Sequence, residues 1–169
     1  RGDERRPLGQ EPGGNRVPAG TGVAVLGSVS QRLQATIDLV MHPVLGVFGG
    51  TFDPIHCGHL ELARELRTAL GFSAVRFIPA GDPPHRAAPV AAAAHRLAMV
   101  ELAIAGHPDL QVDAREVLRS GRSYTVPTLA ELRNEEPSRP LALIVGADAF
   151  LGLPTWHRWR EVFALAHVV

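Results

Sequence analysis

The sequence has 169 residues, no formal net charge, 46% hydrophobic residues and 20% charged residues, which indicates one soluble domain without a basic field for nucleic acid or a membrane. All 17 residues counted as Lys or Arg are Arg, so a Walker-type phosphate loop and a Schiff-base lysine are excluded, because each needs a Lys. The single Cys, Cys57, excludes an internal disulfide and favours a reducing, cytoplasmic compartment.

The N-terminal stretch predicts no part of a folded core. Residues 1–20 are rich in Gly and Pro with scattered charges, a composition typical of disorder. Four apolar residues further on have the spacing of one face of a short helix: Val29, Leu33, Ile37 and Val40. Met41 precedes the first convincing strand, so we expect residues 1–40 to be a disordered or non-native extension. A genuine N-terminal extension is the alternative.

From residue 44 onward, expected strands and helices alternate. Continuous or alternating apolar runs predict strands at 44–48, 74–79, 110–113 and 141–146. Amphipathic or Ala-rich runs predict helices at 59–70, 89–106, 128–136 and 156–165. The last residues, 166–169, are typical of a strand that is beginning. This alternation predicts an α/β fold, an open parallel sheet with helices on both faces.

The end of the first expected strand carries residues suited to binding an anion. Gly49 and Gly50 let the backbone turn sharply and approach a ligand closely. The helix that begins near Gly58 offers free N–H groups and the positive end of its dipole. His56 and His59 are three residues apart, so both rings could face the same side of the first turn and donate hydrogen bonds to phosphate oxygens.

These residues alone leave three interpretations of the turn. A phosphate site and a structural turn with two exposed histidines are about equally favoured. A zinc site built from His56, Cys57 and His59 is disfavoured, because no second Cys pair exists and neighbouring side chains cannot all point at one ion.

The run "GGTFDPIHCGH" at 49–59 resembles the signature of nucleotidyltransferases with the H-x-G-H motif, and specifically the nicotinate-nucleotide adenylyltransferase family. Three further stretches match in order, "IPAGDPPHR" (78–86), "SYTVPTLAEL" (123–132) and "GADAFLGLPTWHRW" (146–159). The resemblance implies a Rossmann-like fold and transfer of AMP from ATP to nicotinate mononucleotide, giving deamido-NAD and pyrophosphate with Mg²⁺. It also implies two small-molecule partners, ATP and the mononucleotide, and admits a homodimer.

The resemblance assigns roles to individual residues. His56 and His59 would be catalytic and hold the ATP phosphates. The nucleotide would be bound by Gly49, Gly50, Thr51, Phe52, Gly58, Gly146 and Asp148. The mononucleotide would be bound by His85, Arg86, Thr125 and Trp156. No protein ligand is assigned to Mg²⁺, since phosphates and water would hold it.

Each of these secondary residues has an ordinary structural alternative. The segment with His85 and Arg86 could be a plain proline turn, Asp148 a helix cap, and Trp156 part of the core. Pro127 stands where the family pattern leads us to expect a polar residue, which affects the start of the following helix.

The sequence departs from the family pattern at its end. The family continues with a further strand and a Ser/Thr-rich motif ending in Arg, and no residues here match that motif. We therefore expect the domain at 41–169 to be truncated at its C-terminus. The alternatives to the main reading are a sibling enzyme, such as pantetheine-phosphate adenylyltransferase or a cytidylyltransferase, and an inactive nucleotide-binding fragment.

Overall fold

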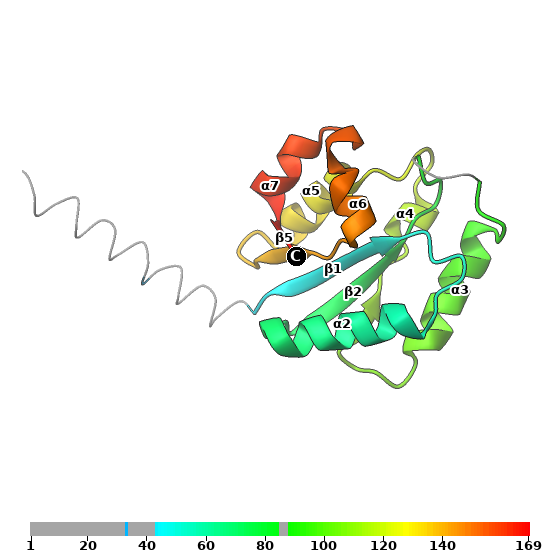
Figure 1. The fold of residues 1–169 in the computed structure, drawn as a ribbon, viewed down its shortest axis with the longest axis horizontal. Helices are drawn as coiled ribbons and strands as arrows, with labels where there is room; N and C mark the ends of the chain where they lie inside the picture. Colours follow the sequence, from blue (N-terminus) through cyan, green and yellow to red (C-terminus); the bar gives the residue numbers. More distant parts are fainter. Residues whose placement is uncertain (1–32, 34–42, 85–87) are drawn as a thin grey trace, which may run out of the picture. The chain divides into compact units, whose positions relative to one another are not determined.

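The computed structural model describes residue 33 and residues 43–84 and 88–169. Five strands in these ranges form one sheet in the order β3-β2-β1-β4-β5, and every neighbouring pair is parallel. The strands are β1 (Leu45–Gly50), β2 (Ala74–Pro79), β3 (Leu110–Val112), β4 (Leu141–Leu143) and β5 (His167–Val168). The predicted open parallel α/β sheet is confirmed (Figure 1).

Helical segments follow the strands along the chain. They are α2 (Cys57–Leu70), α3 (Ala93–Ile104), α4 (Arg115–Leu118), α5 (Thr125–Glu135), α6 (Ala147–Leu151), the 3-10 turns η1 (Leu153–Thr155) and η2 (Trp159–Glu161), and α7 (Val162–Leu165). The expected helix around Leu33 lies outside the described residues except for Leu33 itself. The expected division at residue 41 therefore stays a prediction.

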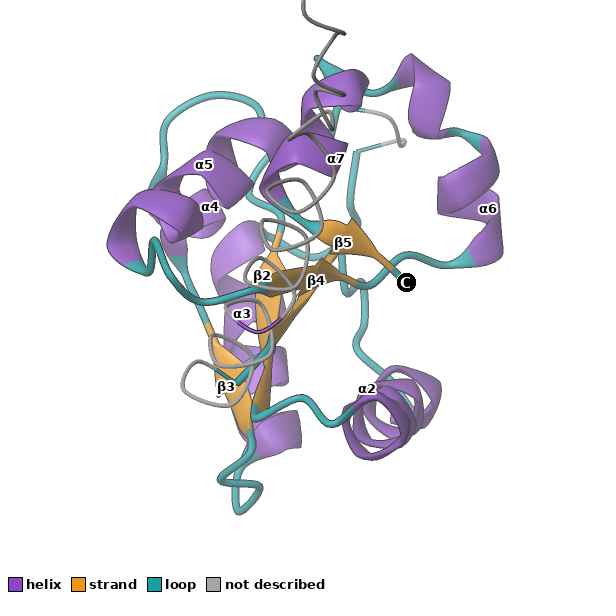
Figure 2. Cartoon of the chain, turned by 90° about the vertical axis from the view of Figure 1, so that its left-hand side faces the viewer, coloured by secondary structure: helices purple, strands orange, loops and turns teal. Residues whose placement is uncertain are grey.

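Alternating side chains of the central strand build two cores, because successive residues of a strand face opposite sides of the sheet. Leu45 and Val47 pack in a cluster with residues of α5 and α7, whereas Phe48 packs in a second cluster with residues of α2 and α3. Helices thus cover both faces of the sheet, as expected (Figures 1 and 2).

Two expected helices are shorter than predicted. The helix expected at 89–106 begins only at Ala93, because the Asp53 carboxylate accepts the N–H groups of Val90 and Ala91 and holds them outside the helix. The helix expected at 156–165 is broken into η2 and α7. Arg158 has φ 55°, and a left-handed residue cannot continue a right-handed helix.

The strand expected at 141–146 is also shorter, and ends at Leu143. The chain still follows β1 for one more residue, since the Ile144 N–H donates to the Val47 carbonyl at 2.8 Å. Pro127 does not prevent a helix from forming at α5. It lies in the first turn, where the backbone N–H needs no partner within the helix.

Candidate active site

The strand order reverses beside β1. The chain leaves β1 through α2 to β2 on one side and later returns to β4 on the other side. In open α/β sheets, ligands bind outside the carboxyl ends of the strands where the order reverses in this way. The residues that follow β1 and β4 are therefore the first candidates for a site.

The turn after β1 exposes its backbone while a buried ring anchors it. Phe52 is a non-glycine residue with φ 49°, a conformation that is uncommon for an aromatic residue and often functional. Its ring is only 3% exposed and packs edge-on against Phe48 at 5.7 Å between centroids. A Cβ on Gly50 would lie 2.9 Å from that ring, whereas a Cβ on Gly49 would meet no atom within 4 Å. Packing therefore explains why residue 50 is a glycine, but it does not explain why residue 49 is one.

The two histidines stack on each other where α2 begins. Their ring centroids are 3.8 Å apart. His56 is the residue before the helix, and its N–H donates to Nδ1 of His59 at 3.3 Å. Because Nδ1 accepts this hydrogen bond, a neutral His59 carries its proton on Nε2. The Nε2 of His59 is therefore a hydrogen-bond donor.

Burial, and secondly the charge of His56, lower the pKa of His59 below its ordinary value of 6.5. The ring is half-buried and contacts Phe52 at 5.1 Å between centroids. The folded protein therefore takes up a proton here less readily than the unfolded chain. The corresponding stabilisation is present above pH 6.5 and is lost as the pH falls through the lowered pKa. At neutral pH, His59 is a neutral donor.

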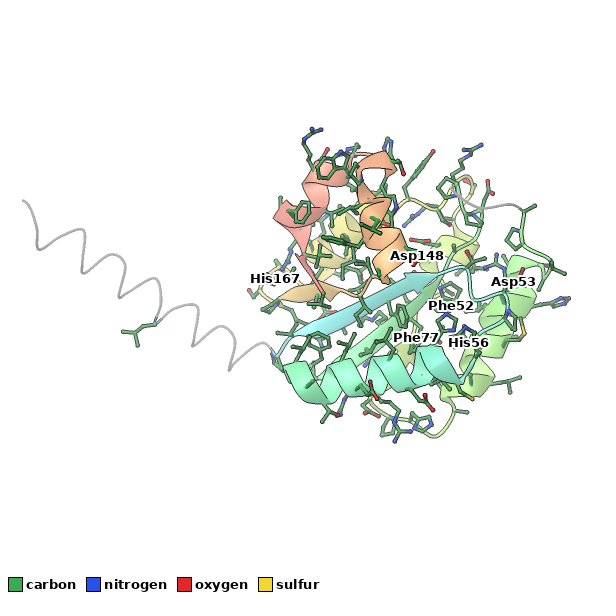
Figure 3. The ribbon with its side chains drawn as sticks, in the orientation of Figure 1. Phe52, Asp53, His56, Phe77, Asp148 and His167 are labelled. Carbon is green, nitrogen blue, oxygen red and sulfur yellow. The ribbon has the colours of Figure 1, made fainter. Side chains whose placement is uncertain are left out.

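Residues after β4 lie at the same end of the sheet. Figure 3 shows Asp148 at the same end of β1 as Phe52, Asp53 and His56. Gly146 is the residue before α6, and a Cβ there would lie 3.0 Å from Oδ1 of Asp148. The residues after β1 and after β4 that were predicted to bind the nucleotide thus lie at one end of the sheet. The expectation that Asp148 could be a helix cap is not met, since it lies within the first turn of α6.

The structure describes two of the four residues expected to bind the mononucleotide, Thr125 and Trp156. Thr125 is half-buried and is the first residue of α5. Trp156 is partly buried and packs against the core beneath α5 and α7, so the structural alternative explains much of its position. The Tyr124 ring stacks on His157 at 4.6 Å between centroids, a contact that the sequence analysis did not predict. The expected residues His85 and Arg86 lie outside the described residues.

A polar network supports the turn before α5. Glu116 is 8% exposed and accepts a hydrogen bond from the Thr128 hydroxyl at 2.6 Å. Ser123 accepts the Gly81 N–H at 2.8 Å. Burial raises the pKa of Glu116, although hydrogen bonds from Thr128 and Ser123 oppose the shift. The network links the loop after β2 to the start of α5.

We expect Glu116→Gln to make the free energy of unfolding less dependent on pH. The folded protein holds a proton on Glu116 more readily than the unfolded chain, so stability falls as the pH rises from the ordinary value of 4.5 through the raised pKa. Glutamine keeps an acceptor for Thr128 but has no charge to bury. At pH 7 the free energy of unfolding of the variant should exceed that of the unaltered chain by about 1 kcal/mol, and this difference should disappear toward pH 4.5. Denaturant unfolding across this range, with Glu61→Gln on the exposed face of α2 as control, measures the difference, and parallel curves would contradict it.

The described residues form neither a metal cluster nor a membrane-spanning helix. Within 43–84 and 88–169, no group of three or more His, Cys, Asp and Glu side chains is arranged to hold a metal ion. Cys57 is exposed and carries a free thiol. No helix in the part of the chain that the structure describes has the length and apolar character needed to cross a membrane.

The fold defines a doubly wound α/β protein, and the turn with the stacked histidines lies at the point where the strand order reverses. The family model for cytidylyltransferase-like proteins matches residues 47–169. The chain therefore belongs to the cytidylyltransferase-like family.

Relatives refine this assignment. A probable nicotinate-nucleotide adenylyltransferase of Dechloromonas aromatica is 57% identical over 129 residues, which are 76% of this chain and 59% of the relative. One of Aeromonas hydrophila, with the same name, is 52% identical over 130 residues, 77% of this chain and 61% of the relative. The predicted resemblance to this group is confirmed, and the chain spans about three fifths of the length of these curated relatives.

A solved structure supports the fold. The nicotinic acid mononucleotide adenylyltransferase of Plasmodium falciparum, in complex with NaAD, has a TM-score of 0.61 at 15% identity and covers 72% of this chain and 60% of its own. At this identity, the likeness bears on the fold alone.

Proposed function

We propose that this chain carries the nucleotide-binding part of an enzyme that transfers AMP from ATP to nicotinate mononucleotide. One observation carries the proposal: the stacked pair of His56 and His59 follows the carboxyl end of the central strand, where the backbone at Gly49 is open. The names of the curated relatives support this choice of substrates.

The proposed reaction needs positioning more than covalent chemistry. A phosphate oxygen of the mononucleotide attacks the α-phosphorus of ATP, and a new P–O bond forms. The bond from the α-phosphorus to the bridging oxygen breaks, and pyrophosphate leaves with that electron pair. Negative charge develops on the phosphate oxygens during transfer, so fixed hydrogen-bond donors accelerate the step.

The histidine pair supplies such donors. His59 donates from Nε2, because its Nδ1 accepts the N–H of His56. The N-terminal N–H groups of α2 point toward the same region, and Gly58 adds no side chain there. Thr51 and Phe52 would contribute backbone N–H groups, while Gly146 and Asp148 would contact the nucleoside from the segment after β4.

Mg²⁺ fits this site only as an ion held by the substrate. The described residues contain no cluster of carboxylates for it, and histidine nitrogens are poor ligands for so hard an ion. When bound to the triphosphate, the ion would neutralise part of the phosphate charge. A cytoplasmic location stays a prediction from the single Cys, and a homodimer stays a prediction from the resemblance.

A direct assay tests the proposal. We expect pyrophosphate and deamido-NAD to form from ATP and nicotinate mononucleotide. Replacing ATP by CTP, or the mononucleotide by phosphopantetheine, should give little product. The reverse preference would favour a cytidylyltransferase or a pantetheine-phosphate adenylyltransferase, and nucleotide binding without turnover would favour an inactive fragment.

We expect nicotinate mononucleotide to be used in preference to its amide, by about tenfold or more in kcat/KM. The Thr125 hydroxyl and the free N–H groups at the start of α5 are donors. Such donors suit a carboxylate, while an amide brings an unwanted donor of its own. Thr125→Val should reduce the preference, and Thr68→Val, on the exposed surface of α2, should leave it unchanged. Steady-state kinetics with both substrates measures it, and equal kcat/KM values would contradict the expectation.

A further inference from the structure

An arginine is buried behind the turn after β1. Arg96 lies in the first turn of α3 and is 1% exposed. Its guanidinium reaches three separate pieces of backbone. Nη1 donates to the carbonyl of Thr51 at 2.6 Å, Nη2 to Gly81 at 3.0 Å, and Nε to Ala91 at 3.1 Å.

Packing alone does not explain an arginine at this position. Arg96, Val100 and Ile104 are spaced four residues apart and form the buried face of α3. An apolar side chain would fill this face without the cost of removing a charge from water. The charge is therefore best explained by the backbone groups that it holds in place.

Asp53 strengthens the same arrangement from the side of the turn. Its carboxylate accepts the N–H groups of Val90 at 2.6 Å and Ala91 at 3.1 Å, and Figure 3 shows it beside Phe52 and His56. Ala91 is thus held twice, through its N–H by Asp53 and through its carbonyl by Arg96. The two charged residues fasten the turn after β1 to the segment before α3.

The hydrogen bond to Thr51 also fixes the direction of the next N–H group. In a planar trans peptide, the carbonyl and the following N–H point in opposite directions. Because the Thr51 carbonyl points inward to Arg96, the Phe52 N–H points away from the arginine. Among the described residues this N–H has no acceptor, and Phe52 itself is held at φ 49°.

We propose that Arg96 is a positioning residue for nucleotide binding: it fixes the peptide between Thr51 and Phe52 so that the Phe52 N–H donates to a phosphate oxygen of ATP. This inference rests on the proposed function. Arg96 touches no substrate and acts only through the backbone. If Arg96 had a purely structural role, replacing it would lower stability and leave the affinity for nucleotide intact. The two roles can therefore be separated.

The test compares two arginines that both bind backbone carbonyls. Arg133 donates to the carbonyls of Arg139 at 2.7 Å and Leu165 at 2.6 Å. These residues precede β4 and β5 and so lie at the amino ends of the strands, opposite the candidate site. We expect Arg96→Lys to weaken ATP binding about tenfold, since one ammonium cannot hold three carbonyls in a fixed fork. Arg133→Lys should lower the melting temperature comparably and leave the dissociation constant of ATP unchanged. Calorimetric titration with ATP and thermal unfolding measure both quantities.

A second measurement needs no variant. Adding ATP to the unaltered chain labelled with ¹⁵N should shift the amide resonance of Phe52, and the shift should be smaller in Arg96→Lys. An unaltered chain that binds ATP without moving this resonance overturns the inference, even if Arg96→Lys fails to fold. Equal ATP affinity in Arg96→Lys and the unaltered chain overturns it as well and leaves the proposed function standing. An unaltered chain that binds no ATP overturns both.

Discussion

His59→Ala should lower the turnover number for AMP transfer by about a hundredfold or more, as expected for the loss of one preorganised donor to a developing charge. The structure gives His59 two separable roles. Its Nδ1 accepts the His56 N–H and so caps α2, while its Nε2 carries the proton of the neutral ring and is a donor. Alanine removes both. The effect should appear mainly in kcat, because the charge on the phosphate oxygens grows in the transition state.

His59→Asn separates the cap from the chemistry. Asparagine offers a short side-chain oxygen that can still accept the His56 N–H, but it has no donor at the place of Nε2. We therefore expect stability close to that of the unaltered chain and turnover nearly as low as with His59→Ala. Cys57→Ser is the matched control, since this exposed thiol lies next to the pair and has no proposed role. An inactive serine variant beside an active alanine variant would contradict the assignment.

The sheet could be predicted because its strands depend on local sequence. The run at 74–79 became β2 with the expected ends, and the apolar run at 44–48 lies largely within β1. The helix starts depend on distant residues and were predicted less well. Nothing near Val90 and Ala91 signals that a carboxylate from the turn after β1 binds their N–H groups. The strand order also depends on packing of the whole domain, and the sequence alone did not indicate it.

The sequence likewise predicted some features of the candidate site and missed others. The stacking of His56 and His59 follows from their spacing, which predicted that both rings could face the same side. Their role in binding phosphate stays a prediction. Arg96 was missed, because its three acceptors come from segments that are far apart in the chain. A signal did exist, since an arginine occupies the apolar face of an expected helix in line with Val100 and Ile104. A charged residue in such a row indicates a buried backbone partner that the sequence cannot name.

Two glycines at the carboxyl ends of β1 and β2 should respond to alanine in opposite ways. A Cβ on Gly81 would lie 2.2 Å from the backbone carbonyl oxygen of Glu116. The Gly81 N–H and carbonyl are both engaged, by Ser123 and Arg96, so the loop cannot move aside without losing these bonds. We expect Gly81→Ala to lower the free energy of unfolding by about 3 kcal/mol or more. Denaturant unfolding measures this loss.

Gly49→Ala completes the comparison, because a Cβ there meets no atom within 4 Å and the residue lies at the exposed end of β1. Alanine costs less backbone entropy than glycine, so stability should stay the same or rise by about 0.5 kcal/mol. If ATP approaches the backbone at this point, the added methyl group should weaken its binding about tenfold or more. Calorimetric titration with ATP measures the change in affinity. Unaltered ATP affinity in a stable Gly49→Ala chain would show that the nucleotide does not approach β1 at Gly49, and the phosphate site would have to lie elsewhere at the carboxyl ends of the strands.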